Sequence, residues 1–129
     1  MTDNRLLYQT AFKKKLEQVG VPFRLEKSNL YFNWTGINCC LNYKSDNSLQ
    51  LCALKLSQFD ADKMARAYVL CNKLNNEIKW LKFVVTKNNE LACMVTTAVN
   101  ADDVVEESLE LLERMQQAVV QMKLQLSLM

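Results

Sequence analysis

Apolar residues recur along this chain at two different spacings, and the order of these spacings predicts the architecture. From residue 3 to residue 18 they follow the three-to-four-residue spacing of an amphipathic helix. Gly20 and Pro22 come directly afterwards, and both residue types are typical of chain just past a helix end. The apolar positions of this first predicted helix are Leu7, Tyr8, Ala11, Phe12 and Leu16.

Residues 23–56 change to the alternating pattern that is typical of β-strands. One alternating run ends at Trp34, Gly36 allows a turn, and a second run covers residues 37–43. A third run at residues 49–56 is apolar on both faces, which predicts a strand in the middle of a sheet. We therefore expect a three-stranded meander in this part of the chain.

The rest of the chain predicts a second helix, a hairpin and a long closing helix. The second helix ends near Asn75, and residues 79–86 and 91–99 then alternate as two strands. Acidic residues from Asp102 onward favour a helix start, and the last helix runs to about residue 126. The apolar stripe of the second helix is Met64, Tyr68, Cys71 and Leu74. That of the last helix is Val105, Leu109, Leu112, Met115, Val119, Met122 and Leu126.

The predicted order is helix, three strands, helix, two strands, helix. In one layer this gives an α+β domain with a mainly antiparallel five-stranded sheet and packed helices. The 129 residues, half of them hydrophobic, fit a single domain over 1–129 with a core of its own. Only two glycines and one proline occur, which argues against linkers and disorder.

Composition excludes several functional classes. The net charge of +2 is smaller than nucleic-acid domains usually carry, so a nucleic-acid partner is not expected. No apolar run reaches the length of a membrane span, and residues 1–20 lack the apolar core of a signal peptide. We therefore expect a cytoplasmic protein with no membrane partner.

The five cysteines fit a reducing compartment. They are odd in number, no CxxC spacing occurs, and the chain has no histidine, so neither a metal nor another cofactor is expected. We interpret the thiols as reduced small hydrophobic residues, and a redox sensor at Cys40 is the alternative. The five positions are Cys39, Cys40, Cys52, Cys71 and Cys93.

Two stretches of this chain resemble the YbjN family. They are residues 70–75, Leu-Cys-Asn-Lys-Leu-Asn, leading into Lys79–Phe83, and the stretch from Glu90 through Asp103 into the long helix. The resemblance covers most of the chain, although its motifs are loose patterns. The family's domain is similar to the fold of type III secretion chaperones, and its members are loosely described as regulators of sensory transduction. The resemblance implies an α+β sandwich, frequent dimerisation and binding of protein segments. Secretion chaperones are usually acidic, whereas the pI here is near 8.3, which argues against a role in secretion.

These observations favour a non-enzymatic, dimeric protein-binding module, chaperone-like or regulatory, whose partner is a protein segment or a second copy of the chain. One face of the predicted sheet must pack on helices, while the other still carries apolar side chains that need a cover. The second helix, a twin subunit or a client segment are the three candidate covers. The alternative is a small regulator that responds to redox changes through a cysteine or binds nucleic acid through aromatic strand residues. The candidate protein-binding residues are Trp34, Trp80, Val84 and Met94.

Overall fold

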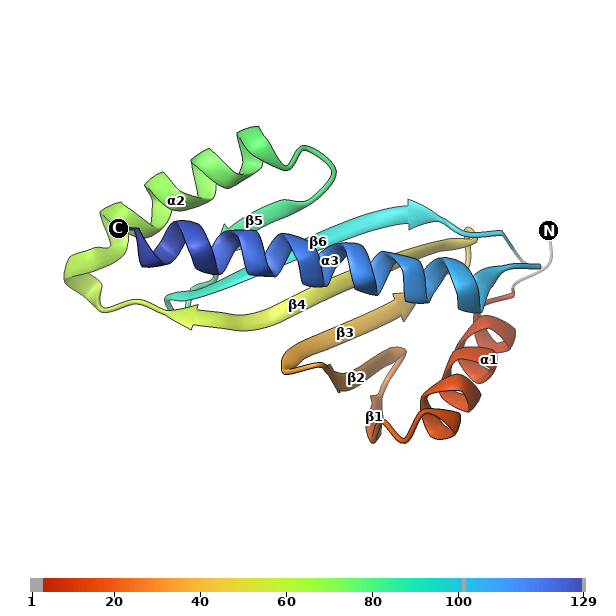
Figure 1. Ribbon diagram of the computed structural model, residues 1–129. Helices are drawn as coiled ribbons and strands as arrows, with labels where there is room; N and C mark the ends of the chain where they lie inside the picture. The colour runs from red at the N-terminus through yellow and green to blue at the C-terminus, as the bar shows by residue number, and fades with distance from the viewer. Residues whose placement is uncertain (1–3, 101, 129) are drawn as a thin grey trace.

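The computed structural model describes residues 4–100 and 102–128 and shows a layer of helices packed on a β-sheet (Figure 1). Its helices are α1 (Arg5–Gln18), α2 (Met64–Glu77) and α3 (Val104–Ser127), with a short 3₁₀ turn, η1 (Ala61–Lys63), before α2. Its strands are β1 (Phe23–Glu26), β2 (Asn29–Trp34), β3 (Ile37–Tyr43), β4 (Ser48–Gln58), β5 (Lys82–Val85) and β6 (Glu90–Ala98). The predicted α+β class is confirmed, and the order of helices and strands agrees with the prediction except for one additional strand. Residue 3, where we expected the first helix to begin, lies outside the described residues.

All strand pairs are antiparallel, in the order β1-β2-β3-β4-β6-β5. The strand at residues 49–56 was expected to be central, and β4 does lie between β3 and β6. The predicted count of five strands is wrong, because β1 adds a sixth at the outer edge. Its residues Phe23-Arg24-Leu25-Glu26 alternate between apolar and charged, but the run is only four residues long and mostly exposed, so it was too short to stand out as a strand.

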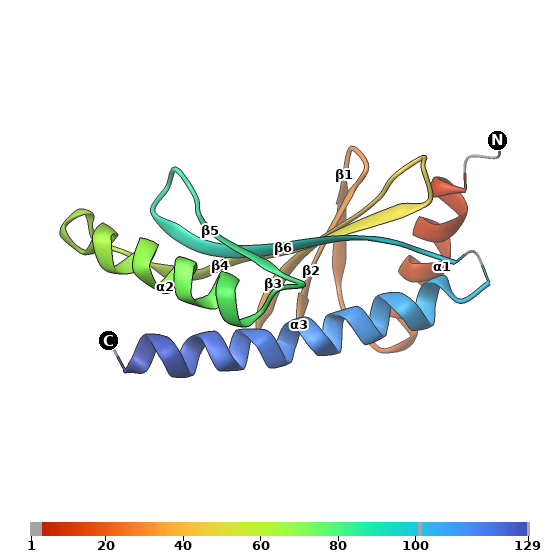
Figure 2. The ribbon, with the colours of Figure 1, turned by 90° about the horizontal axis from the view of Figure 1, so that it is seen from above.

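The helices lie on one side of the sheet, with α3 along nearly its whole length (Figure 2). Leu112 and Met115 are buried, with 2% and 1% of their surface exposed, as the apolar stripe predicted. At the start of α3 the buried residues are Val104, Ser108 and Leu111, one position from those expected. The expected pair, Val105 and Leu109, lies half-buried against the same core.

Two residues of the predicted helix stripes face solvent instead. Leu7 in α1 is 65% exposed and Tyr68 in α2 is 60% exposed. In α2 the buried side is set by Ala67, Leu70 and Leu74, and the small Ala67 lets the helix come close to its neighbours. Each of these two residues is next to a buried one, Tyr8 or Ala67. Because apolar residues occupy neighbouring positions in both helices, the sequence did not show which of them faces the core.

A buried hydroxyl pair attaches α3 to the sheet. Ser108 Oγ donates to the carbonyl of Val104 at 2.6 Å, which uses its one proton. The Tyr43 hydroxyl, 2.7 Å away, must therefore donate to Ser108 Oγ. Because buried polar groups are costly without partners, this contact fixes the rotation of α3 over β3.

The outer edge of β5 is closed by a side chain and not by a strand. The Asn75 amide at the end of α2 donates to the carbonyl of Phe83 at 3.0 Å and accepts from its N–H at 2.6 Å. The amide thus replaces the two hydrogen bonds that a neighbouring strand would make.

Candidate binding surfaces

The face of the sheet away from the helices has an apolar row through its centre. Tyr31 lies opposite Cys40, Cys40 opposite Cys52, and Cys52 opposite Met94, so the row crosses β2, β3, β4 and β6 in register. All four side chains are half-buried, and the helices lie on the other side (Figure 2). We call this set the open-face row.

Polar residues border the open-face row along one side. Asn29, Asn42, Gln50 and Thr96 form the next cross-strand row, in the same register. At the β1 end, the Arg24 guanidinium lies 4.8 Å from the centre of the Tyr31 ring and also pairs with Glu26 at 3.0 Å. At the β5 end, Lys82 lies opposite Met94.

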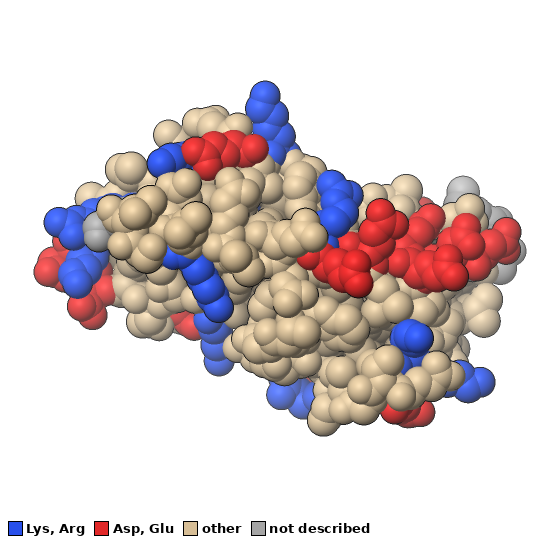
Figure 3. Space-filling view, in the orientation of Figure 1, with Lys and Arg blue, Asp and Glu red and all other residues tan. Residues whose placement is uncertain are grey.

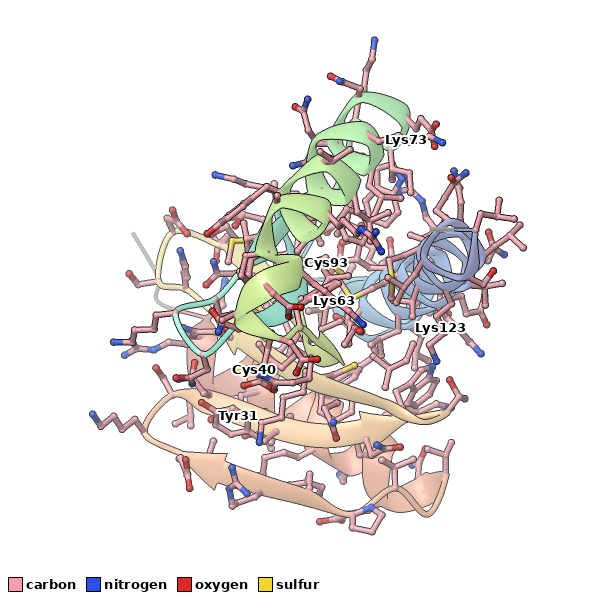
Figure 4. All side chains as sticks on the ribbon, turned by 90° about the vertical axis from the view of Figure 1, so that its left-hand side faces the viewer. Tyr31, Cys40, Lys63, Lys73, Cys93 and Lys123 are labelled. Atoms are coloured by element: carbon pink, nitrogen blue, oxygen red, sulfur yellow. The ribbon has the colours of Figure 1, made fainter. Side chains whose placement is uncertain are left out.

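The two cysteines of the open-face row are protonated at neutral pH. Burial raises the pKa of Cys52 to about 11. Burial also raises the pKa of Cys40, although a hydrogen bond from Tyr31 partly opposes this. The pKa of Tyr31 is raised in turn, chiefly by the charge of a Cys40 thiolate. Figure 4 shows Tyr31 and Cys40 side by side on neighbouring strands, with Cys93 farther toward the helices. The pair contributes apolar surface and not a ready nucleophile.

The remaining thiols are no more reactive. Burial raises the pKa of both Cys39 and Cys93, on the helix side of the sheet, to about 12. It raises the pKa of Cys71 as well. Within residues 4–100 and 102–128, no group of three or more histidine, cysteine or acidic side chains could hold a metal ion. The described helices include none that is long and apolar enough to cross a bilayer.

A second candidate surface lies beside β6, because β5 covers only part of its edge. β5 pairs with Leu91–Met94, so β6 from Val95 to Ala98 has β4 on one side and no described strand on the other. Figure 1 shows β5 beginning partway along β6. Thr96, Thr97 and Ala98 are all exposed, although their side chains point alternately to the two faces. We call this segment the free β6 edge.

Two hollows adjoin the free β6 edge. One of about 460 Å³ lies between β6 and the α2–β5 connection, with Trp80, Lys82 and Thr96 in its wall. Another of about 230 Å³ lies between Thr97 and α3, where Glu110 contributes an acidic wall. Acidic side chains gather over the first half of α3 (Figure 3).

The Arg114 side chain of α3 stands between the two hollows and stacks on Trp80. Its guanidinium carbon is 4.4 Å from the centre of the indole ring, which is the geometry of a cation–π contact. This contact joins the α2–β5 connection to α3.

The four predicted binding residues do not form one surface. Val84 and Met94 lie on the open face, on β5 and β6. Trp80, expected on the same face, precedes β5 and stacks on α3 instead, although it shares the larger hollow with Met94. Trp34 lies on the helix side of the sheet, half-buried against the core.

Sequence reasoning missed three members of the open-face row, namely Tyr31, Cys40 and Cys52, as parts of one surface. Their alternation showed that they share a face of their own strands, but a row also requires the register between strands. The sequence gives one weak indication of the free β6 edge, because Val95–Ala98 lacks the charged residues that often protect an exposed strand edge. Its exposure depends on where β5 starts, which the alternating pattern placed too early.

Comparison with solved structures identifies a shared fold. The chain superposes on the crystal structure of YbjN from E. coli with a TM-score of 0.63 over 91% of this chain and 92% of that one, at 12% sequence identity. That structure is described as "a putative transcription regulator". An uncharacterised protein from Methanothermobacter thermautotrophicus matches over 92% of both chains with a TM-score of 0.48 and 14% identity. No family model matches this sequence, and no curated protein does. The fold is therefore YbjN-like, as the sequence resemblance predicted.

Proposed function

We propose that this chain is a non-enzymatic regulatory module that binds a segment of another protein and acts as a homodimer. The observation that carries the proposal is the open face of the sheet, where apolar side chains lie in register with no described helix over them. A soluble protein rarely leaves an apolar patch exposed without a binding role. The helices already cover the opposite face, so a partner is the remaining cover for this one.

The chemistry of the side chains supports binding without catalysis. The pKa of every cysteine thiol is raised by burial, which keeps the potential nucleophiles protonated. The chain has no histidine to act as a base near neutral pH. The two hollows beside β6 are lined by lysine, glutamate and arginine side chains and an aromatic ring, which suit recognition better than proton transfer.

The regulatory part of the proposal comes from the shared fold. The E. coli protein with a similar fold is described as "a putative transcription regulator". We propose a regulatory role for this chain by analogy with that description. The dimer rests on the free β6 edge, which no described strand pairs, and on the frequency of two-fold symmetry among oligomers.

A photo-crosslinking experiment tests the binding face. A photoreactive amino acid replaces Met94 in the open-face row, and the matched control carries it at Lys87, in the exposed β5–β6 turn. We expect a defined partner segment to crosslink at position 94 and not at 87. Crosslinking at 94 should also fail when Cys52→Arg places a charge in the centre of the row. Equal crosslinking at both positions, or no effect of Cys52→Arg, would contradict the proposal.

The position of Cys40 opposite Cys52 favours redox response as the second candidate function. Opposite residues of antiparallel strands have Cα atoms about 4.5–5.5 Å apart, within the range that a disulfide spans. Two thiols would pass two electrons and two protons to a small disulfide such as oxidised glutathione, forming one S–S bond and two glutathione thiols. Mass spectrometry after such treatment should show the intact chain lighter by two hydrogens, and Cys40→Ser should abolish the change. A chain that stays fully reduced rules this candidate out.

A further inference from the structure

Alternate residues of the free β6 edge direct their main-chain groups away from β4. The Val99 N–H donates to the carbonyl of Asn47 at 2.9 Å, on the β4 side. Because the direction of these groups alternates along an antiparallel strand, those of Thr96 and Ala98 point away from β4. β5 does not reach these two residues, so their N–H and C=O groups face the open edge. The Thr97 hydroxyl makes a long contact of 3.5 Å with the Ala98 carbonyl, which can accept a second hydrogen bond through its other lone pair.

The other sheet edges are protected against pairing, which makes this one exceptional. β1 is four residues long and carries Arg24 and Glu26, features that discourage another strand. The outer edge of β5 is occupied by the Asn75 amide. The free β6 edge carries no charge of its own and consists of β-branched residues and alanine, which suit a paired strand.

Charges beside the free β6 edge differ at its two ends. Lys79 and Lys82 lie in the wall of the larger hollow, where β5 begins, and Lys79 lies beside α3 whereas Lys82 is on the open face. Glu110 and Arg114 of α3 lie in the wall of the smaller hollow, where β6 ends, and Arg114 stacks on Trp80. A partner that pairs antiparallel with this edge is therefore favoured if it brings an acidic group to Lys79 and a basic group to Glu110.

We propose that a second copy of this chain supplies that strand, with the free β6 edges of two copies paired antiparallel about a two-fold axis at Thr97. Thr96 of each copy then lies opposite Ala98 of the other, and the outward N–H and C=O groups of both residues form hydrogen bonds. The same rotation keeps the helix sides of the two sheets together and brings Lys79 of each copy toward Glu110 of the other. The inference rests on the dimer in the proposed function and specifies where it forms.

The length of the free edge agrees with this arrangement. In the pair, the end of each β6 lies beside the partner's β6 and points toward the partner's β5, which begins at Lys82 opposite Met94. A longer β6 would collide with that β5. Each chain must therefore leave the sheet just after Ala98. It does so here, since β6 ends at Ala98 and the Asn100 N–H donates to the Glu107 carboxylate at 2.9 Å in the turn into α3.

Light scattering of the full chain, over micromolar to sub-micromolar concentrations, tests the location of the dimer. We expect twice the 14.9 kDa mass of one chain. Thr96→Pro removes an outward N–H without touching the β4 ladder and should yield monomer, whereas Thr96→Ala should remain dimeric. Urea unfolding shows whether the proline variant is folded.

Charge reversal provides a second test that does not depend on proline. Glu110→Lys alone and Lys79→Glu alone should each weaken the dimer roughly tenfold, and mixing the two variants should restore it as a heterodimer. Glu113→Lys and Lys87→Glu are the matched controls, because neither side chain lines the hollows.

Each outcome separates the two proposals. A dimer that Thr96→Pro and both charge reversals leave intact overturns the β6 pairing and leaves the homodimer in place. A monomeric wild-type chain overturns both the pairing and the proposed homodimer. A monomer whose Thr96 and Ala98 amide signals shift on adding a strand-forming peptide would assign the edge to a foreign segment, which also overturns the pairing of two copies.

Discussion

Replacing Asn75 with alanine should loosen the hairpin that carries the free β6 edge. The Asn75 amide makes two hydrogen bonds to the main chain of Phe83, at 3.0 and 2.6 Å. A hydrogen bond of this kind contributes about 0.5–1.5 kcal/mol net, so losing both should cost about 1–3 kcal/mol. Asn75 is half-exposed, so removing its side chain opens the Phe83 groups to water and the full desolvation penalty does not apply.

The matched control for this change is Asn72→Ala. Asn72 lies one turn earlier in α2 and is exposed, so both variants gain the same helix propensity of alanine over asparagine. The difference between the two variants therefore isolates the contact with Phe83. Asn75→Asp keeps the acceptor for the Phe83 N–H but sets a carboxylate against its carbonyl, so it should be no more stable than Asn75→Ala.

Urea unfolding followed by circular dichroism measures the effect. With a typical slope of about 2 kcal/mol per molar urea, a loss of about 2 kcal/mol lowers the midpoint by about 1 M. Amide hydrogen exchange adds a local measure, because the Phe83 N–H should exchange much faster in Asn75→Ala. Midpoints within about 0.2 M for Asn75→Ala and Asn72→Ala, together with unchanged exchange at Phe83, would refute the role assigned to the amide.

Three further expectations concern the core. Leu112→Ala should lower the free energy of unfolding, measured in urea, by about 2–5 kcal/mol, because it leaves a cavity in the core. Glu113→Ala should change it by less than about 0.5 kcal/mol. Similar values for the two variants would show that the buried stripe of α3 lies elsewhere. Tyr43→Phe should cost about 1 kcal/mol because it removes the buried hydroxyl contact to α3, and no loss would show that the contact is neutral. Burial raises the pKa of Cys39 and Cys93 from 9.0 to about 12, so the unfolded chain releases these protons first. Their contribution to stability should be complete below pH 9 and fall as the pH rises toward 12, and Cys93→Ala should flatten that decline in urea midpoints.

The sequence predicted the elements that have strong periodic patterns. The core-facing alternation in β2 and β3 and the long stripe of α3 each bury many apolar residues, so tertiary packing agrees with the local pattern. β1 was missed because a short, charged edge strand has no buried face to reveal it. Trp80 was misplaced because Trp80-Leu81-Lys82 continues the alternation of β5 backward, while the stacking of Trp80 on Arg114 turns the chain away.

The candidate surfaces needed information that no single segment contains. The open-face row exists only because the registers of three strand pairs agree at Cys40 and Cys52. The free β6 edge is set by the start of β5 at Lys82, which depends on the connection from α2. Pairing and edge exposure are thus properties of the assembled sheet, whereas helix and strand periods are properties of the chain.

The one-sided placement of the helices also determines how this fold can change over evolutionary time. Only alternate strand positions, such as Cys39, Leu41 and Tyr43 in β3, must remain apolar to hold the two layers together. The intervening positions on the open face carry no such packing requirement, so substitutions there should leave the architecture intact. A sheet constrained at every second residue can therefore be specified by many different sequences. The E. coli structure, which has a similar fold at a TM-score of 0.63 with 12% identity, agrees with a fold that constrains few residues.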